Sequence, residues 1–193
     1  MQIKPSHWFM AWMVATLSLT SHDLAAQTNA TPAPLPAVTP IASLDVPRYM
    51  GTWYEIAKFP NRFQAKCVAN TRARYLTQAD GSVQVLNSCV MADHSTIDAL
   101  GLAKQVGPAT SPKLEVRFAP AWLSWLPMVW GDYWVIDLDA DYQLAAVSDA
   151  KREYLWVLSR TPQVNAKAYD ALLARLKAQH FDVQKLELTP QQR

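Results

Sequence analysis

Few side chains of this 193-residue chain could do chemistry, and they form no known catalytic or metal-binding arrangement. Two cysteines cannot supply a four-ligand zinc site, and the histidines form no HExxH or similar cluster. Two acids on expected strands, Glu55 and Asp137, lack the paired carboxylate that would indicate general acid–base chemistry. The sequence therefore predicts no metal site, no cofactor and no catalytic residue. The histidines are His7, His22, His94 and His180.

Cys67 and Cys89 are the only cysteines, and we expect them to form a disulfide. They flank an expected hairpin whose turn lies at Asp80-Gly81. A plain two-residue turn would place residue 72, not residue 67, opposite Cys89. A disulfide therefore requires that the segment with Cys67 folds back or that the hairpin contains bulges. The alternative is two free, buried thiols.

The N-terminus has the pattern of an export signal, which would allow the disulfide to form. Lys4 precedes an apolar run at 8–19, and small residues follow. We expect a signal peptide at 1–26, with cleavage after residue 30 or an uncleaved anchor as alternatives. The run of 12 residues is shorter than the roughly 20 that span a bilayer. No cysteine lies near either cleavage site, so a lipid-anchored N-terminus is not supported. Residues 27–43, rich in Pro, Ala and Thr, are expected to form a flexible or extended linker.

The composition fits one globular domain, since 50% of residues are hydrophobic, 18% are charged and the net charge is +2. A charge so near neutral gives no electrostatic footprint for a nucleic-acid partner. From Leu44 onward, apolar and polar residues alternate between recurring turn signals, which is typical of an antiparallel sheet. Eight consecutive short strands predict an all-β, eight-stranded antiparallel up-and-down β-barrel. They are expected at 53–57, 68–77, 83–89, 97–106, 113–118, 133–138, 142–148 and 154–159.

The strand at 154–159 is apolar on both faces, so its outer face needs a cover. The next segment supplies one, because residues 164–180 carry an apolar stripe with helical spacing. We therefore expect a C-terminal α-helix packed on the outside of the barrel. A last strand at 182–188 is expected to complete the domain, and 189–193 to form a tail. The stripe consists of Tyr169, Leu172, Leu173 and Leu176.

Three motifs, in order and correctly spaced around the expected hairpins, resemble those of the lipocalin family. The first is Gly51-Thr52-Trp53-Tyr54, the second covers 133–138 with Asp141-Tyr142, and the third covers 154–162. The resemblance extends over residues 44–188 and is greatest to the bacterial outer-membrane and apolipoprotein D-like branch. It implies the same barrel with one external helix. Trp53 and Arg160 fall at the same end of such a barrel, and the family pattern implies that the guanidinium stacks on the indole and closes the floor.

The opposite end of the barrel is expected to be open and to carry an aromatic rim. Strand direction places loops 59–66, 92–96, 119–131 and 149–153 at this mouth, and loops 79–81, 107–112 and 139–141 at the floor. We expect the mouth aromatics to contact a membrane surface or an incoming lipid, because tryptophan favours such interfaces. A small core that caps the barrel and a dimer contact are the alternatives. These aromatics are Phe59, Phe63, Trp122, Trp125 and Trp130.

Alternate residues of the expected strands would line the barrel and bind a ligand inside it. The alternative is that these side chains simply fill the barrel. The resemblance implies a fatty acid or lysophospholipid as the ligand, with its head group near Lys58, Arg62 and Lys66. Glu55 and Asp137 would meet a ligand hydroxyl if they face inward, which the sequence does not decide. The expected ligand-binding residues are Tyr75, Val85, Asn87, Val116, Phe118, Tyr133, Val135 and Trp156.

The resemblance also implies a role for the protein: lipid storage or transport in membrane maintenance under stress. We expect a periplasmic protein, with association with the outer membrane and formation of a homodimer as further options. One alternative is an isoprenoid-converting enzyme, for which Tyr75, Tyr133 and Asp137 are the only candidate acids or bases. A second alternative is a surface protein that uses its aromatic loop only for membrane or partner contact and carries no ligand.

Overall fold

The structure is a computed structural model that describes residues 34–192. The expected signal peptide at 1–26 lies outside the described residues, as does the first part of the expected linker. Residues 35–45 have no regular secondary structure but are tied to the barrel. The backbone N–H of Ile41 donates to the Val135 carbonyl (3.0 Å), and that of Leu44 donates to the Thr110 carbonyl (2.8 Å). The side chains of Val38 and Leu44 are buried.

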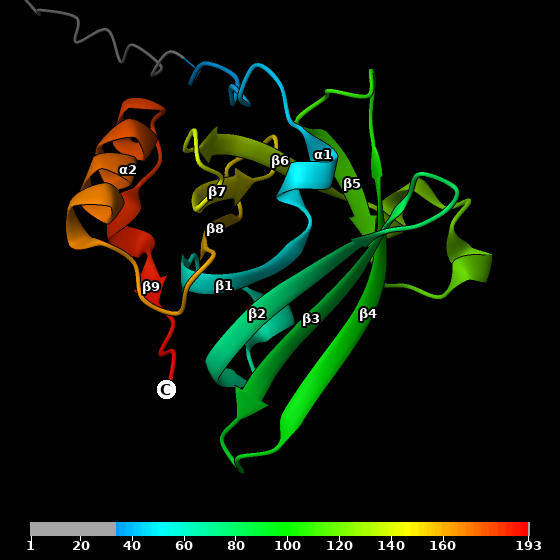
Figure 1. Ribbon diagram of the computed structural model, residues 1–193, viewed down its shortest axis with the longest axis horizontal. Helices are drawn as coiled ribbons and strands as arrows, with labels where there is room; N and C mark the ends of the chain where they lie inside the picture. The colour runs from blue at the N-terminus through cyan, green and yellow to red at the C-terminus, as the bar shows by residue number, and fades with distance from the viewer. Residues whose placement is uncertain (1–33, 193) are drawn as a thin grey trace, which may run out of the picture. The chain divides into compact units, whose positions relative to one another are not determined.

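Eight strands form a closed antiparallel up-and-down barrel, which confirms the expected fold (Figure 1). Strands adjacent in the chain are paired in space, and β1 closes the barrel by pairing with both β2 and β8. A ninth, two-residue strand extends the sheet along β1. The strands are β1 (Gly51–Lys58), β2 (Cys67–Thr77), β3 (Val83–Met91), β4 (Thr96–Gln105), β5 (Lys113–Arg117), β6 (Gly131–Leu138), β7 (Leu144–Ser148), β8 (Leu155–Ser159) and β9 (Glu187–Leu188).

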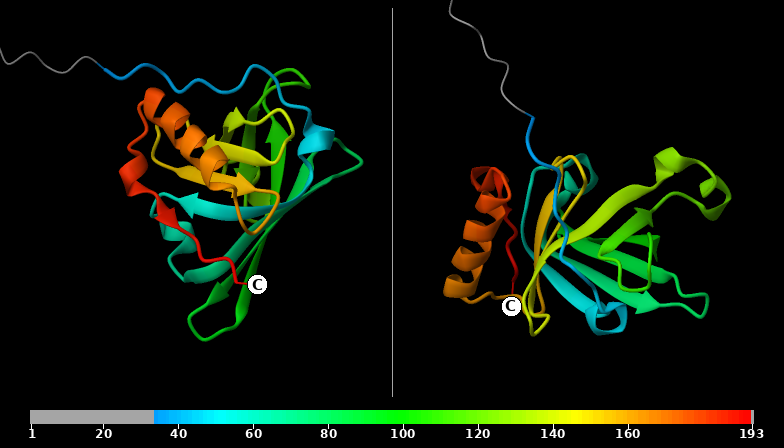
Figure 2. Two further views of the ribbon diagram at one scale, coloured as in Figure 1. Left: turned by 60° about the vertical axis from the view of Figure 1, so that its left-hand side comes forward. Right: turned by 90° about the horizontal axis from the view of Figure 1, so that it is seen from above.

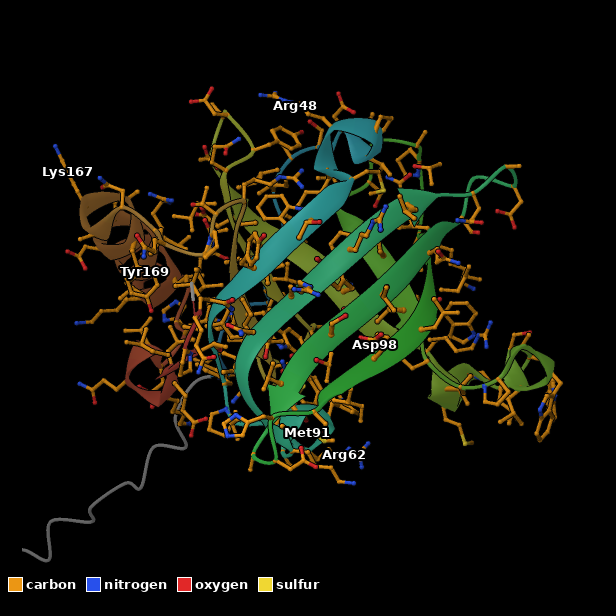
Figure 3. All side chains as sticks on the ribbon, turned by 60° about the horizontal axis from the view of Figure 1, so that its bottom comes forward. Arg48, Arg62, Met91, Asp98, Lys167 and Tyr169 are labelled. Carbon is orange, nitrogen blue, oxygen red and sulfur yellow. A yellow bond between two sulfur atoms is a disulfide. The ribbon has the colours of Figure 1, made fainter. Side chains whose placement is uncertain are left out.

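The two ends of the barrel differ, as the loop assignment predicts. The short helix α1 (Val46–Tyr49) lies at the floor, and a 3₁₀ turn at Arg62–Gln64 lies at the mouth. Figure 3 shows Arg48 at one end of the molecule and Arg62 with Met91 at the other. At the mouth, β4 projects beyond its neighbour, because it pairs with β5 only between Leu102 and Gln105.

The disulfide between Cys67 and Cys89 is confirmed, with 5.6 Å between the two Cα atoms. Two bulges in β2 bring the cysteines together, one between Cys67 and Ala69 and one between Ala69 and Arg72. Each bulge adds one residue to β2, so Cys67 pairs with Met91 and lies diagonally opposite Cys89. Of the two expected routes to a disulfide, the bulged hairpin is therefore the correct one.

Helix α2 (Ala166–Ala178) packs on the outer face of β6, β7, β8 and β1, as expected (Figure 2). Leu172 and Leu176 are fully buried against apolar residues of these strands. Arg175 adds a bidentate ion pair, since its Nε and Nη2 donate to the Asp137 carboxylate at 2.7 and 2.8 Å. The helix begins after Asn165, whose side chain accepts a hydrogen bond from the Ala168 N–H.

The prediction of a strand at 182–188 is wrong over most of that range. Residues Val183–Lys185 form a 3₁₀ turn, because the Asp182 side chain accepts from the Gln184 N–H and favours a turn over an extended start. Only β9 remains as strand, and the chain then continues between β1 and β2. There the Thr189 N–H donates to the Ile56 carbonyl (2.9 Å), and the Asn70 N–H donates to the Pro190 carbonyl (2.8 Å).

Candidate functional site

The floor of the barrel is closed by Arg160, which follows β8. Its guanidinium carbon lies 4.0 Å from the centroid of the Trp53 ring, which is completely buried. The same guanidinium donates to the carbonyls of Thr52 (3.0 Å), Arg48 (3.0 Å) and Tyr142 (3.2 Å). Arg160 thus ties β1, α1 and the β6–β7 turn to the end of β8. Every polar contact of this guanidinium is structural, and no acid or base accompanies it.

Three tyrosines lie above Trp53 and form the inner surface of the floor. The Tyr133 hydroxyl lies 3.0 Å from the Tyr49 hydroxyl and 2.9 Å from the Tyr75 hydroxyl. Burial raises the pKa of Tyr75 to about 12 and raises the pKa values of Tyr49 and Tyr133 above their ordinary value. All three phenols are therefore neutral at physiological pH, and none is a general base there.

The inner wall of the barrel is mainly apolar. The pairings place Ala73, Asn87 and Ala99 in one row of the sheet, and Tyr75, Val85 and Gly101 in the next row toward the floor. Residues of one row point to one face, and these two rows share the inner face because they are two positions apart along each strand. The buried inner cluster contains the floor residues together with Val85, Val135 and Leu158.

The structure brings the eight expected ligand-binding residues to this inner face. Six of them belong to the buried inner cluster or pack against it: Tyr75, Val85, Val116, Tyr133, Val135 and Trp156. Asn87 lies in the same row as Ala73. The ring of Phe118 lies against Gly101, where an added Cβ would come within 2.7 Å of it.

The inner wall becomes more exposed from the floor toward the mouth. Near the floor, Val83 and Ala103 pair with each other and are buried. Near the mouth, the inner-facing Ile97 and Phe118 are 40% and 44% exposed, and Ala99 is exposed as well. These apolar groups are open to solvent on the side where β4 projects beyond β5. The inner wall is therefore exposed at the mouth and buried at the floor.

A buried polar network lies on the wall below the mouth, around Glu55. Its carboxylate accepts hydrogen bonds from Gln64 in the β1–β2 loop and from the Thr189 hydroxyl (2.5 Å). Gln64 Oε1 in turn accepts from Trp156 Nε1 (2.9 Å) and Asn61 Nδ2 (2.8 Å). Burial raises the pKa of Glu55, more than the bonds from Thr189 and Gln64 lower it. The network fastens the β1–β2 loop and the C-terminal segment to one buried acid.

The segment between β5 and β6 carries three large apolar side chains that are almost fully exposed. It contains two 3₁₀ turns, Ala121–Leu123 and Pro127–Val129. Trp122, Trp125 and Met128 are 74%, 75% and 84% exposed. We call these three side chains the apolar tip. Such exposure excludes a small core made by Trp122 and Trp125, which was one alternative for this segment.

Trp130 differs from the two exposed tryptophans, because its ring and its Nε1 contact other residues of the protein. Its ring lies under Lys104 Nζ at 4.3 Å and near the Arg117 guanidinium at 5.3 Å. Its Nε1 donates to the Ser124 carbonyl (2.8 Å). Arg117 also donates to the Ala119 carbonyl. The expectation that Trp130 presents its ring to a membrane is therefore corrected to a supporting role.

The two phenylalanines expected at the mouth also differ in burial. Phe63 is exposed, and its ring centroid lies 5.5 Å from that of Tyr154. Phe59 is buried in the outer cluster beneath α2, and its N–H donates to the Leu155 carbonyl (2.8 Å). The expectation that Phe59 faces the mouth is therefore corrected. A bulge between Glu55 and Ala57 shifts the end of β1, and the chain that follows turns toward the helix.

Of the expected head-group cations, Lys58 is already paired. Its Nζ lies 3.0 Å from a carboxylate oxygen of Glu187 on β9. Arg62 lies over the Phe63 ring at 5.1 Å, and Lys66 is exposed. Arg62 and Lys66 thus remain at the mouth for an anionic head group.

Asp137 faces outward, because a bulge between Val135 and Asp137 turns both Ile136 and Asp137 toward α2. Its carboxylate is held by Arg175, so it is remote from any ligand in the barrel. In residues 34–192, no cluster of three or more histidine, cysteine or acidic side chains could hold a metal ion. The same part of the chain contains no helix long and apolar enough to cross a membrane.

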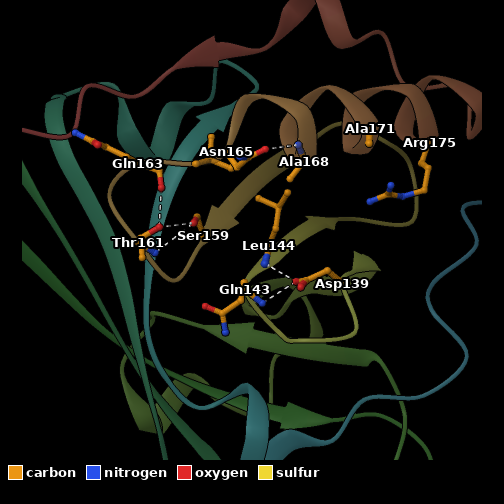
Figure 4. A pocket seen from close by; sticks show the side chains of 11 residues that line it. Asp139, Gln143, Leu144, Ser159, Thr161, Gln163, Asn165, Ala168, Ala171 and Arg175 are labelled. Atoms are coloured by element: carbon orange, nitrogen blue, oxygen red, sulfur yellow. Dashed lines mark hydrogen bonds between the residues drawn. The ribbon is translucent and has the colours of Figure 1, made fainter.

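Two clefts lie outside the barrel. One, of about 350 Å³, is lined by residues of α2, the β6–β7 turn and the segment after β8 (Figure 4). Its polar groups already bond within the protein: Asp139 accepts from the Gln143 and Leu144 N–H groups, and Asn165 from the Ala168 N–H. The other, of about 300 Å³, lies on the outer face of β1, β2 and β3. We place the functional site inside the barrel, where apolar groups converge.

Sequence reasoning missed four residues of this site: Tyr49, Gln64, Thr189 and, as an inner-facing acid, Glu55. Glu55 has a sequence signal, because it is two positions from the inward Trp53 on the same strand. Tyr49 and Gln64 lie outside the strands, and Thr189 lies beyond the repeating pattern. Their roles follow from contacts between distant segments, which the local pattern does not encode.

The family model and the similar proteins all belong to or resemble one family of barrel proteins. Residues 44–191 match the family model of the lipocalin-like domain. The chain is 42% identical over 153 residues to temperature-induced lipocalin-1 of Arabidopsis thaliana, covering 78% of this chain and 81% of that protein. It is 36% identical over 155 residues to outer membrane lipoprotein Blc of Escherichia coli K12, covering 80% and 83%. It is 30% identical over 157 residues to apolipoprotein D of Macaca fascicularis, covering 78% of each chain.

Solved structures show the same fold. The tobacco hornworm protein insecticyanin aligns with a TM-score of 0.61 at 19% identity, covering 82% of this chain and 87% of that one. The cockroach allergen Per a 4 aligns with a TM-score of 0.61 at 18% identity, covering 80% and 94%. At these identities the likeness concerns the barrel alone.

The raised pKa of Glu55 predicts a pH-dependent stability. The folded protein binds the Glu55 proton more tightly than the unfolded chain, whose pKa is near the ordinary value of 4.5. The stabilisation is therefore fully present below about pH 4.5 and is lost as the pH rises through the folded-state pKa. We expect the free energy of unfolding of the wild type to increase, relative to Glu55→Gln, as the pH falls from about 7 toward 4.5.

Urea unfolding followed by tryptophan fluorescence measures this difference at each pH. The exposed Glu153→Gln is the matched control and should show no comparable trend. Parallel pH profiles for the wild type and Glu55→Gln, or a difference of the opposite sign, would contradict a raised pKa at Glu55.

Proposed function

The chain belongs to the lipocalin family, and on that premise we propose that it is a carrier of one acyl lipid of the bacterial envelope. Lipocalins mostly bind small hydrophobic ligands. We propose a fatty acid or lysophospholipid as the ligand here, held with its chain in the barrel. The observation that carries the proposal is the inner wall: apolar, sealed by Trp53 and Arg160 at one end and exposed at the other.

The energetics of chain burial support a lipid ligand. Each buried CH₂ group contributes about 0.8 kcal/mol, so a chain of about ten such groups gains about 8 kcal/mol. Association and ordering costs reduce this gain, and contacts of the head group add to it. The net result is compatible with binding in the micromolar range, which corresponds to about 8 kcal/mol. Arg62 and Lys66 are the side chains available to an anionic head group.

The biological role that we propose is lipid storage or transport in membrane maintenance under stress. The names of two relatives support it, one a temperature-induced lipocalin and the other an outer membrane lipoprotein. We further propose that the protein is exported to the periplasm and works at the outer membrane. The apolar pattern at 8–19 and the disulfide support export.

The lumen should lose its ligand when a bulky side chain blocks it. Asn87 lies halfway along β3 and faces inward, whereas the adjacent Leu86 lies on the outer face. We expect Asn87→Trp to reduce the affinity for a dansyl-labelled fatty acid at least tenfold, because the indole occupies the path of the chain. Leu86→Trp adds the same indole outside and should bind as the wild type does.

Native mass spectrometry of the purified wild type should also show one co-purified lipid per barrel, and Asn87→Trp should show less. Equal lipid content and equal affinity in the two variants would contradict binding in the lumen. Absence of any lipid and of any probe binding in the wild type would contradict the carrier function itself.

We also propose that the apolar tip contacts the membrane from which the lipid is taken. Tryptophan is favoured where apolar surface meets the lipid head groups. Lys104 lies over the Trp130 ring at 4.3 Å and is exposed, but its Nζ also lies 3.3 Å from a carboxylate oxygen of Glu115, and Arg117 is buried. The proposed membrane contact therefore rests on the exposed apolar groups of the tip.

Replacing Trp122 and Trp125 by Ser should weaken binding to phosphatidylethanolamine–phosphatidylglycerol vesicles at least tenfold. Full burial of a large apolar side chain is worth about 1.5–3 kcal/mol, so loss of two such contacts exceeds a factor of ten. Leu100→Ser, which removes another exposed apolar side chain of β4, is the control and should bind vesicles normally. Vesicle flotation measures the binding. Unchanged vesicle binding of the double variant would contradict membrane contact. So would sedimentation showing that the wild type is a dimer and the double variant a monomer, because the tip would then be a dimer contact.

A further inference from the structure

The three floor tyrosines form a hydrogen-bonded chain at the place where a bound lipid would end. Tyr49 precedes β1, Tyr75 belongs to β2 and Tyr133 to β6, so three distant segments bring their hydroxyls together. The Tyr49 and Tyr75 rings stack with centroids 5.9 Å apart, and Tyr133 meets the Tyr75 ring edge-on at 6.0 Å. Tyr49 and Tyr75 are buried. The hydroxyls are thus fixed by ring packing and lie within the inner cluster.

Counting hydrogens shows that one O–H group among the three tyrosines has no acceptor. Each hydroxyl donates one hydrogen bond, so the three supply three donors. Only two contacts join them, Tyr133 to Tyr49 and Tyr133 to Tyr75. Among residues 34–192, none of the three hydroxyls contacts any further acceptor. Whatever the direction of the two bonds, one hydrogen is therefore left over.

The charges around the hydroxyls favour an acceptor oxygen. The positive charge of Arg160, behind Trp53, lowers the pKa values of Tyr49 and Tyr75, although burial raises them far more, and the negative charge of Glu55 raises the pKa of Tyr75 by less than Arg160 lowers it. The phenols therefore remain protonated donors in a positive local field. A partially or fully negative oxygen is the partner that such a site binds best.

We propose that the floor binds a hydrogen-bond acceptor at the inner end of the ligand, so that the carried lipid has a carbonyl, carboxyl or hydroxyl oxygen at its deepest atom. This inference rests on the proposed carrier function and narrows its ligand class: a fatty acid with its carboxyl group at the mouth fits the floor only if its chain carries a second oxygen at the inner end. A chain that ends in a methyl group would leave the spare O–H buried without a partner, which is unfavourable. A chain that ends in an oxygen accepts it. The floor therefore selects between lipids that the apolar wall alone would hold equally well.

The test compares two short ligands that differ only in this acceptor. Undecan-2-one carries a carbonyl, and 2-methylundec-1-ene is its isostere with CH₂ in place of the oxygen. Neither ligand has a charged head group that would hold it at the mouth, so both can reach the floor. Displacement of a dansyl-labelled fatty acid gives both affinities in the wild type and in a variant with Tyr49, Tyr75 and Tyr133 all changed to Phe. The variant keeps the rings and lacks every donor, and Tyr54→Phe, on the outer face, is the matched control.

The preference for the ketone over the alkene should be about fivefold greater in the wild type than in the triple variant, as one net hydrogen bond allows. Tyr54→Phe should keep the wild-type preference. The wild type should also show a tyrosine ultraviolet difference spectrum on adding the ketone but not on adding the alkene, a readout that is independent of variant folding. Equal preference in the wild type and the folded triple variant, with no difference spectrum, would overturn the proposal and indicate that water satisfies the hydrogen. Failure of the wild type to bind the dansyl probe would instead refute the carrier function.

Discussion

The stack of Arg160 on Trp53 is the contact on which the rest of the barrel depends. A closed barrel needs β1 to pair with both β2 and β8, and β1 bends to do so: its first half pairs with β2 and its second half with β8. Arg160 holds this bend, since it donates to the Thr52 carbonyl of β1 from the end of β8. A cation–π contact of this kind contributes about 0.5–2 kcal/mol, and hydrogen bonds from a charged group add about 1.5–3 kcal/mol each. The inner face is therefore buried at the floor and exposed at the mouth.

The contrast between the two ends follows from this closure. At the floor, ring packing among Tyr49, Trp53 and Tyr75 leaves only the hydroxyls as polar groups. At the mouth, β1 and β2 no longer pair, and the C-terminal segment fills the gap with Gln191, whose Nε2 donates to the carbonyls of Glu55 and Thr71 (2.8 Å each). One end is therefore fixed by stacked rings and the other by a polar network around a buried acid. An amphiphile with its chain inward matches this gradient.

The fold and most of the inner wall could be predicted from the sequence, because strand alternation is a local property. Once Trp53 is set inward, period two assigns Tyr75, Val85, Asn87 and Val116 to the lumen. The errors occur where a bulge shifts that period or where a distant contact overrides it. A bulge in β1 places Phe59 under α2, and the aromatic content of 119–131 did not separate the supporting Trp130 from the exposed Trp122. A bulge in β6 settles the orientation of Asp137, which the sequence left open, by turning it toward α2. The hydrogen bonds among the three tyrosines join residues 84 and 58 positions apart (49 to 133 and 75 to 133), so no local pattern could reveal them.

The central claim is that an acyl chain lies inside the barrel. The most direct measurement is isotope-filtered NMR of the protein with uniformly ¹³C-labelled hexadecanoic acid, which detects proximity between the chain and assigned methyl groups. The account predicts intermolecular NOEs from the chain to the methyl groups of Val85, Val135 and Leu158, at one fatty acid per protein. NOEs confined to Met128 and other outer-surface methyl groups, with none to these three inner residues, would contradict it.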